Sequence, residues 1–232
     1  MRTVLLIFSI ILLILMICSC AAPTVIPRES FVKITSRIEA TMCNEDECSD
    51  QEMNWYGSGV IVKHSNKKSF VLTAAHICNK EYMRERLLDP EKLYIRFRLH
   101  DHNGITHKGR VHKMDISNDL CILRTRRIYD AASIKLSSNG PYQWEKVYNL
   151  AAPMGYAGRT YVPLVEGYYS GYTARQMIFT CPAIGGSSGS PIFNKTGELV
   201  GMISAVHTAY PMISMSPHYF ILKKMVLEIK DD

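Results

Sequence analysis

The amino-acid sequence predicts an all-β fold of the barrel or sandwich class. Short apolar or alternating runs recur about every ten residues from residue 30 onward, and polar turns separate them. Two stretches alone stand out with helix-like patterns. The chain has 232 residues, of which 47% are hydrophobic and 21% are charged, so it can bury a sizeable core in one domain or two small ones.

The predicted strands form two successive groups. The first group reads SFVKITSRI, WYGSGVIVKH, SFVLTAA, KLYIRFRLH, THKGRVHKM and LCILR. The second group reads KVYNLAA, YVPLVEGYYSGY, QMIFTC, SPIFN and ELVGMISAV. Turn signals rich in Asn, Gly and Ser lie between runs, as in HSNKKS, DHNG and NKTG. The most irregular stretch, residues 126–141, predicts a connection between two halves of the molecule.

Two helices are expected, a short one around residues 73–88 and one over residues 218–229 near the end of the chain. The second has apolar side chains at helical spacing. These are Phe220, Leu222, Met225, Val226 and Ile229.

The first 19 residues have the layout of an export signal. Arg2 precedes an apolar run over residues 4–17, which is shorter than the roughly 20 residues that span a bilayer. The end of the run resembles a bacterial lipobox, in which Cys20 would be lipidated and become the new N-terminus. Plain cleavage near Ala21 and an uncleaved anchor are the alternatives. We therefore expect an exported protein, periplasmic or extracellular, with residues 20–29 as a linker to a folded domain over residues 30–232.

Five further cysteines follow this segment, and an exported protein permits disulfides. Cys43 and Cys48 flank the acidic loop CNEDEC and could close a small ring. Cys121 lies in an apolar run and is expected to be a buried small hydrophobe. With Cys78 and Cys181 the number is odd, so at least one free thiol or an intermolecular link is predicted.

Three short motifs contain the residue types of nucleophilic catalysis. VLTAAHIC contains His76 after a predicted strand, ISNDLCILR contains Asp119 before one, and GGSSGSP, residues 185–191, contains three serines. A serine hydroxyl is a weak nucleophile and needs a base within hydrogen-bond reach. Histidine can take and return the proton, while a carboxylate on its other ring nitrogen holds the required tautomer. Glycine beside the serine lets the chain aim backbone amides at an oxyanion.

These motifs resemble those of the trypsin-like serine proteases of the chymotrypsin fold, nearest to the bacterial HtrA-type and glutamyl-endopeptidase branches. The order His, Asp, Ser matches that fold. The resemblance covers about residues 30–225, and it is carried by GSGVIV (57–62), VLTAAH (71–76), NDLCIL (118–123), GSSGSP (186–191) and ELVGMIS (198–204). It implies two antiparallel six-stranded barrels, about residues 30–127 and 140–218, with a short C-terminal helix over about residues 218–230.

The resemblance also implies the roles of single residues. In the frame G-x-S-G-x-P the nucleophile is the third residue, Ser188, rather than Ser187 or Ser190. His76 would be the general base and acid, and Asp119 would orient it, with Asp115 as the less favoured carboxylate. The backbone amides of Gly186 and Ser188 would form the oxyanion hole. The implied activity is that of a serine endopeptidase acting on protein or peptide substrates through an acyl-enzyme, without a cofactor or metal.

The specificity pocket of that family is expected to be uncharged here. Pro182, six residues before the nucleophile, would lie at its base, and Ser204, Ala205 and Val206 would form the other wall. Such a pocket favours a small or medium-sized apolar side chain.

Alternative functions have less support in the sequence. Non-catalytic binding proteins on the same scaffold typically lack one of the three motif residues, and here all three are present. An ester hydrolase on this scaffold would carry the same three residues. His100 and His102 could hold a metal on one strand face, but no convincing third ligand accompanies them. The net charge is +6, yet no basic run with interleaved aromatics predicts a nucleic-acid partner. A membrane contact is expected only through the N-terminus, and no PDZ domain is expected after the last helix.

Overall fold

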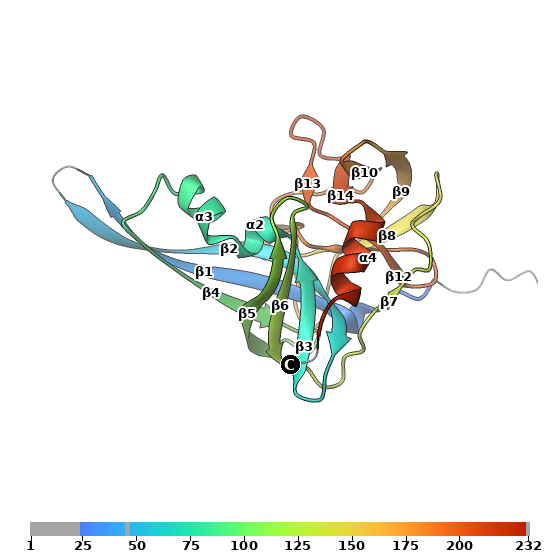
Figure 1. Ribbon diagram of the computed structural model, residues 1–232, viewed down its shortest axis with the longest axis horizontal. Coiled ribbons are helices and arrows are strands. Elements are labelled where there is room, and N and C mark those ends of the chain that lie inside the picture. The colour runs from blue at the N-terminus through green and yellow to red at the C-terminus, as the bar shows by residue number, and fades with distance from the viewer. Residues whose placement is uncertain (1–23, 45–46, 231–232) are drawn as a thin grey trace, which may run out of the picture.

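The computed structural model describes residues 24–44 and 47–230, and it confirms the all-β fold class. A closed six-stranded barrel is followed by an eight-stranded sheet and a C-terminal helix (Figure 1). The export signal over residues 1–19 and the lipidation site Cys20 lie outside the described residues, so both stay predictions. Within the described part of the chain, no helix is long and apolar enough to cross a bilayer.

The first half is an antiparallel barrel in which the strands pair in the order β1-β2-β3-β6-β5-β4. It ends at Arg126, close to the boundary expected from the sequence. Its strands are β1 (Phe31–Cys43), β2 (Cys48–His64), β3 (Lys68–Thr73), β4 (Lys92–His100), β5 (Thr106–Asp115) and β6 (Leu120–Arg126).

The second half is a sheet with the strand order β13-β14-β10-β9-β8-β11-β12-β7, so it has eight strands rather than six. The short β7 lies in the stretch that the sequence left irregular, and it pairs in parallel with β12. The strands are β7 (Lys135–Leu136), β8 (Lys146–Leu150), β9 (Leu164–Tyr172), β10 (Gln176–Phe179), β11 (Pro191–Phe193), β12 (Glu198–Met202), β13 (Ala205–Val206) and β14 (Ser214–Pro217).

The helix expected over residues 73–88 is present as two short helices, α2 (Ala75–Cys78) and α3 (Lys80–Arg86). They are separated because Asn79 has an extended backbone and caps α3. Its Oδ1 accepts from the backbone N of Glu81 at 2.9 Å. Two single-turn 3-10 helices, η1 (Arg28–Ser30) and η2 (Pro153–Gly155), complete the helices before the C-terminal one.

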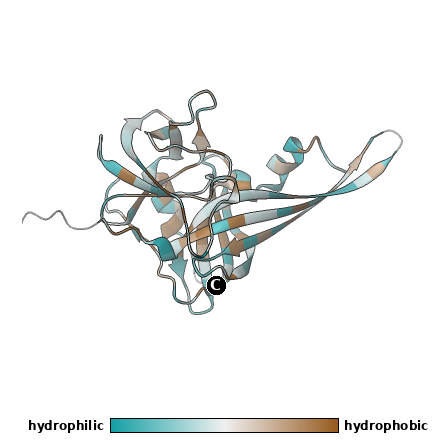
Figure 2. Cartoon of the chain, turned by 180° about the vertical axis from the view of Figure 1, so that it is seen from behind, coloured by the Kyte–Doolittle hydropathy of each residue, from teal (hydrophilic) through white to brown (hydrophobic). Residues whose placement is uncertain are grey.

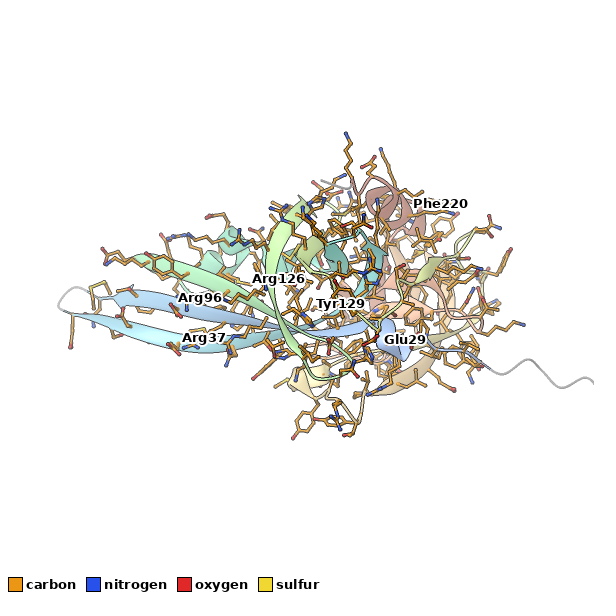
Figure 3. All side chains as sticks on the ribbon, turned by 90° about the horizontal axis from the view of Figure 1, so that it is seen from below. Glu29, Arg37, Arg96, Arg126, Tyr129 and Phe220 are labelled. Atoms are coloured by element: carbon orange, nitrogen blue, oxygen red, sulfur yellow. A yellow bond between two sulfur atoms is a disulfide. The ribbon has the colours of Figure 1, made fainter. Side chains whose placement is uncertain are left out.

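The C-terminal helix α4 (Tyr219–Leu227) packs against both halves of the molecule. Its apolar face is as expected except for Phe220, which is 67% exposed (labelled in Figure 3). The neighbouring Tyr219 takes the buried position instead and joins the core of the second half, and its hydroxyl donates to the carbonyl of Ser137. The largest hydrophobic cluster joins residues of the barrel to Leu222, Met225 and Val226 of α4. Ile229 also belongs to this cluster, but it lies just after the helix, which ends at Leu227 rather than at residue 229.

The strands β1, β2 and β4 continue beyond the barrel as a long ribbon, which the sequence did not predict (Figure 1). One face packs on α3, where Ile38 and Met83 are fully buried. The other face is polar, and its charges pair across the strands: Arg37 contacts Glu52 at 2.6 Å and Arg96 contacts Glu39 at 2.8 Å. Figure 2 shows the resulting mixture of hydrophilic and hydrophobic residues along the ribbon.

The cysteines form two disulfides. Cys43–Cys48 closes the tip of the ribbon, as the sequence allowed. The expectation for Cys121 is corrected: it is buried, but it is bonded to Cys78 rather than being a free hydrophobe. The sequence around Cys121 does not indicate this disulfide, because Cys78 comes close to β6 only when the chain folds and α2 packs beside that strand. Cys181 is the free thiol among the described cysteines, and burial raises its pKa to about 12.

His64 links the segment that connects the two halves, residues 127–134, to the barrel. Its Nε2 lies 2.8 Å from the carbonyl oxygen of Ala131, and its Nδ1 lies 2.8 Å from the hydroxyl of Ser69. Burial lowers the pKa of His64 below its ordinary value of 6.5, and the charge of Arg127 adds to this, against the opposing hydrogen bond to Ala131.

We expect the unfolding free energy to fall as the pH drops below 6.5, since the unfolded chain then binds a proton that folded His64 takes up only at lower pH. His64→Gln keeps a donor and an acceptor without titrating, so it should reduce this slope. Urea unfolding at pH 7.5, 6 and 5 measures the effect, with the exposed His207→Gln as the control. His100, whose pKa is also lowered by burial, should leave a residual slope. An unchanged slope in His64→Gln would contradict this account.

Candidate active site

His76 and Asp119 are brought together by the pairing of β3 with β6. His76 lies on α2, directly after β3, and Asp119 directly precedes β6. The Nδ1 of His76 is 2.9 Å from Oδ2 of Asp119 and 3.1 Å from Oδ1, and the backbone N of His76 donates to Oδ1 at 2.9 Å. Because an ionised carboxylate only accepts, Nδ1 is the donor in these contacts, and Nε2 is the ring nitrogen that Asp119 does not contact.

The disulfide Cys78–Cys121 holds the same two segments together covalently. Cys78 ends the helix that carries His76, and Cys121 is the second residue of the strand that follows Asp119. Both cysteines are buried, at 5% and 0% exposure. Two links therefore constrain the position of the imidazole relative to the carboxylate: the pairing of β3 with β6 and this disulfide.

Asp115 has a different part in the same turn. Its Oδ1 accepts from the backbone N of Asn118 at 3.1 Å, and its Oδ2 accepts from the Asn118 side chain at 2.7 Å. This turn leads into Asp119, whose φ of 52° lies in the left-handed region that Asp and Asn tolerate better than most residues. Asp115 thus shapes the turn, while Asp119 contacts the histidine.

The three serines of GGSSGSP have distinct environments. Ser187 and Ser190 are buried, at 3% and 0% exposure. The hydroxyl of Ser190 accepts from the side chain of Asn149 at 2.8 Å, and that of Ser187 lies 3.4 Å from the backbone N of Ile184. Ser188 is partly exposed and lines one cleft together with His76 and Asp119. Of the three serines, Ser188 is the one that lines the same cleft as the histidine.

Ser58 connects this loop to the barrel, and the sequence analysis assigned it no role. Its hydroxyl donates to the carbonyl of Gly186 at 2.9 Å and accepts from the backbone N of Ala152 at 2.9 Å. Its backbone N donates to the carbonyl of Ser188 at 2.8 Å. Ser58 is fully buried. The only sequence signal was its place between two glycines in GSGVIV, which marks a close approach of backbones.

The turn at Gly186 requires glycine. Its φ is +91°, and a Cβ there would lie 2.4 Å from the carbonyl oxygen of Ala152. Since the carbonyl of Gly186 is held by Ser58, its peptide plane has a defined orientation. Within the described residues, the backbone N–H groups of Gly186 and Ser188 donate to no protein acceptor.

The cleft that contains these residues has a volume of about 670 Å³. The tyrosine ring of Tyr82, on α3, lies beside His76 with ring centroids 5.6 Å apart, and Arg86 lines the same side. Neither was singled out from the sequence. On the opposite side of the cleft, Pro182 does not line the cavity, contrary to the expectation. The lining there comes from the residues just after it, Ala183 and Ile184, and from the wall expected from the sequence. That wall contains Ser204, Ala205 and Val206, together with Ile203.

No metal site accompanies the cleft in the described part of the chain. The one group of three potential ligands found there is Cys43, Cys48 and Glu91, and its two sulfurs are joined in a disulfide. His100 hydrogen-bonds through both ring nitrogens, to Thr35 at 3.2 Å and Thr106 at 2.9 Å.

The family model described as "Trypsin-like peptidase domain" matches residues 57–202, which is more than half of the chain. The match contains β2 from Gly57, α2, the turn before β6 and the GGSSGSP loop. No curated protein matches the chain.

Proposed function

Because the chain belongs to the family of trypsin-like peptidase domains, we propose that it is a serine endopeptidase that cleaves peptide bonds through an acyl-enzyme on Ser188. A protease of this family acts on protein or peptide substrates. The observation that carries the proposal is the convergence of His76, Asp119 and Ser188 on one cleft, with the other two serines of the loop buried beside it.

In the proposed reaction, Ser188 attacks the scissile carbonyl while Nε2 of His76 takes its proton. The same nitrogen then protonates the leaving amine, and in deacylation it activates water. The negative charge of the Asp119 carboxylate stabilises the imidazolium. The carboxylate is held beside the ring by two hydrogen bonds, one from Nδ1 and one from the backbone N of His76. Support for these roles is geometric: Nδ1 is occupied, so Nε2 is the nitrogen left for the serine.

The oxyanion of each tetrahedral intermediate would accept hydrogen bonds from the amides of Gly186 and Ser188. Two facts support this assignment: neither amide has a protein acceptor within the described residues, and Ser58 holds the carbonyl of Gly186. Donors held in advance need no reorganisation when the charge develops, which makes such a site worth about 10²–10³ in rate per donor.

The experiment that tests the function is digestion of a denatured protein by the purified chain, with fragments identified by mass spectrometry. A fluorophosphonate probe, which acylates activated serines, should label the protein and stop the digestion. Hydrolysis of a simple ester without any peptide cleavage would favour an ester hydrolase on this scaffold. Neither labelling nor hydrolysis would favour a non-catalytic binding protein.

We further propose that the side chain before the scissile bond is small or medium-sized and apolar. The cleft wall beside Ser188 includes Ala183, Ile203 and Ala205, which offer apolar contact, and none of the other lining residues between 183 and 208 is charged. A peptide library should therefore be cleaved after Ala, Val or Leu about 10- to 200-fold faster than after charged residues. Preferred cleavage after Arg, Lys or Glu would contradict the proposal without affecting the catalytic assignment.

A further inference from the structure

A second cleft, of about 870 Å³, lies on the first barrel and shares no lining residue with the cleft of Ser188. Its walls come from β3, β5 and β6 and from the turn before β3. Among the residues that the structure describes, no Asp or Glu lines it. Arg126, one of the lining residues, is labelled in Figure 3. The cationic residues in the lining are Lys67, Lys68, Lys108, Arg110, Arg124 and Arg126.

The strand register sets cations directly opposite one another around this cleft. Arg110 pairs with Arg124, and Lys68 pairs with Arg126. The cleft residue Lys108 pairs with Arg98 of β4. Like charges in directly opposite positions destabilise a sheet. An anion bound between these charges would relieve the repulsion.

Most of the cations in this cleft lack a carboxylate partner within residues 24–44 and 47–230. Among the described residues, Lys67, Lys108, Arg110 and Arg126 have no ion-pair partner. The buried Asp101 contacts the cleft residue His107 at 2.8 Å, but its other oxygen accepts from two backbone amides at 2.9 Å each. That carboxylate is therefore committed to its own loop and to His107.

We infer that this cleft binds a compact ligand with several phosphate groups. Arginine and lysine donors match the multiply charged phosphate oxyanion. Cations gathered in one concave site favour dense negative charge over a long polymer, which would need a stripe of cations. The lining has no Phe, Tyr or Trp on which nucleic-acid bases would stack.

Isothermal titration of the purified chain with sodium tripolyphosphate tests the inference. The double variant Lys108→Gln/Arg110→Gln should weaken binding about tenfold or more, since each charged contact contributes strongly to affinity. Removing the opposed charges should also leave the melting temperature of the free protein unchanged or raised. Tripolyphosphate should raise the melting temperature of the wild type and not that of the variant. A destabilised but binding-competent variant would overturn the inference.

The control variant Arg175→Gln/Lys195→Gln removes the same charge from exposed positions elsewhere. Equal loss of binding in both doubles would mean an effect of net charge alone and would overturn the site. Vesicles with cardiolipin, whose headgroup carries two phosphates, are compared with phosphatidylcholine vesicles to identify the source of the ligand. Cleft-dependent binding to cardiolipin assigns a lipid headgroup, and binding to tripolyphosphate alone assigns a soluble ligand. Binding of neither, or of a single-stranded oligonucleotide alone, would contradict the inference.

Discussion

Replacing Ser188 by alanine is expected to lower kcat/KM for peptide hydrolysis by about 10⁴-fold or more and to abolish fluorophosphonate labelling. The reason is that the acyl-enzyme has no other oxygen to form on: Ser187 and Ser190 are buried, while Ser188 lines the cleft with His76. The Ser188 side chain has no hydrogen-bond partner in the described chain, so its loss should leave the melting temperature nearly unchanged.

The matched controls are the neighbouring serines. Ser187→Ala should keep its labelling and most of its activity. Ser190→Ala should also be labelled but should be less stable by about 1–3 kcal/mol, because the buried amide of Asn149 then loses a partner. Labelling that persists in Ser188→Ala and disappears in Ser187→Ala would move the nucleophile to the other serine.

Replacing Asp119 by asparagine is the second large effect, with an expected loss of about 10⁴-fold in kcat. An asparagine keeps the backbone turn, because it tolerates the φ of 52° at this position. Its oxygen can also still accept from the backbone N of His76. Its NH₂ group, however, would face Nδ1 and favour the tautomer in which Nε2 carries the proton, so His76 could not act as base.

Asp115→Asn is the control for this variant, since Asp115 lies in the same turn and contacts Asn118 instead of His76. We expect Asp115→Asn to lower the melting temperature slightly and to retain activity. Steady-state kinetics with a good peptide substrate, together with thermal unfolding of both variants, separates the two effects. If Asp119→Asn kept a tenth of the activity or more while Asp115→Asn lost it, the orienting carboxylate would be Asp115.

The candidate active-site residues could be proposed from the sequence because each occurs in a short motif that resembles one of a known family. His76 follows a strand ending in Thr-Ala-Ala, Asp119 follows Asn118 in a turn, and Ser188 stands between glycines. The contact between His76 and Asp119 agrees with the predicted constellation. Ser58 escaped notice because its role depends on where the backbone of Gly186 passes, which no local pattern reports.

Other features required long-range pairing. The apolar surroundings of Cys121 predicted burial correctly, but its bond to Cys78 depends on α2 docking against β6. The residues between the predicted strands that end at Ile38 and begin at Trp55 extend both strands into a ribbon, because their charges pair across strands and α3 covers the other face. The cleft wall includes Ala183 and Ile184 instead of Pro182. The sequence motif placed this wall one or two residues too early, because the path of the backbone decides which side chains reach the cleft.

The sequence by itself determined the all-β class, the C-terminal helix and the three candidate catalytic side chains, because periodicity and short motifs are properties of neighbouring residues. Only the tertiary structure decided that two disulfides form, that Ser58 joins the nucleophile loop to the barrel, and that lysines and arginines from three strands meet in one cleft. These features arise from strand order and register. Residues 67 and 126 lie far apart in the chain and become neighbours only when β3 pairs with β6.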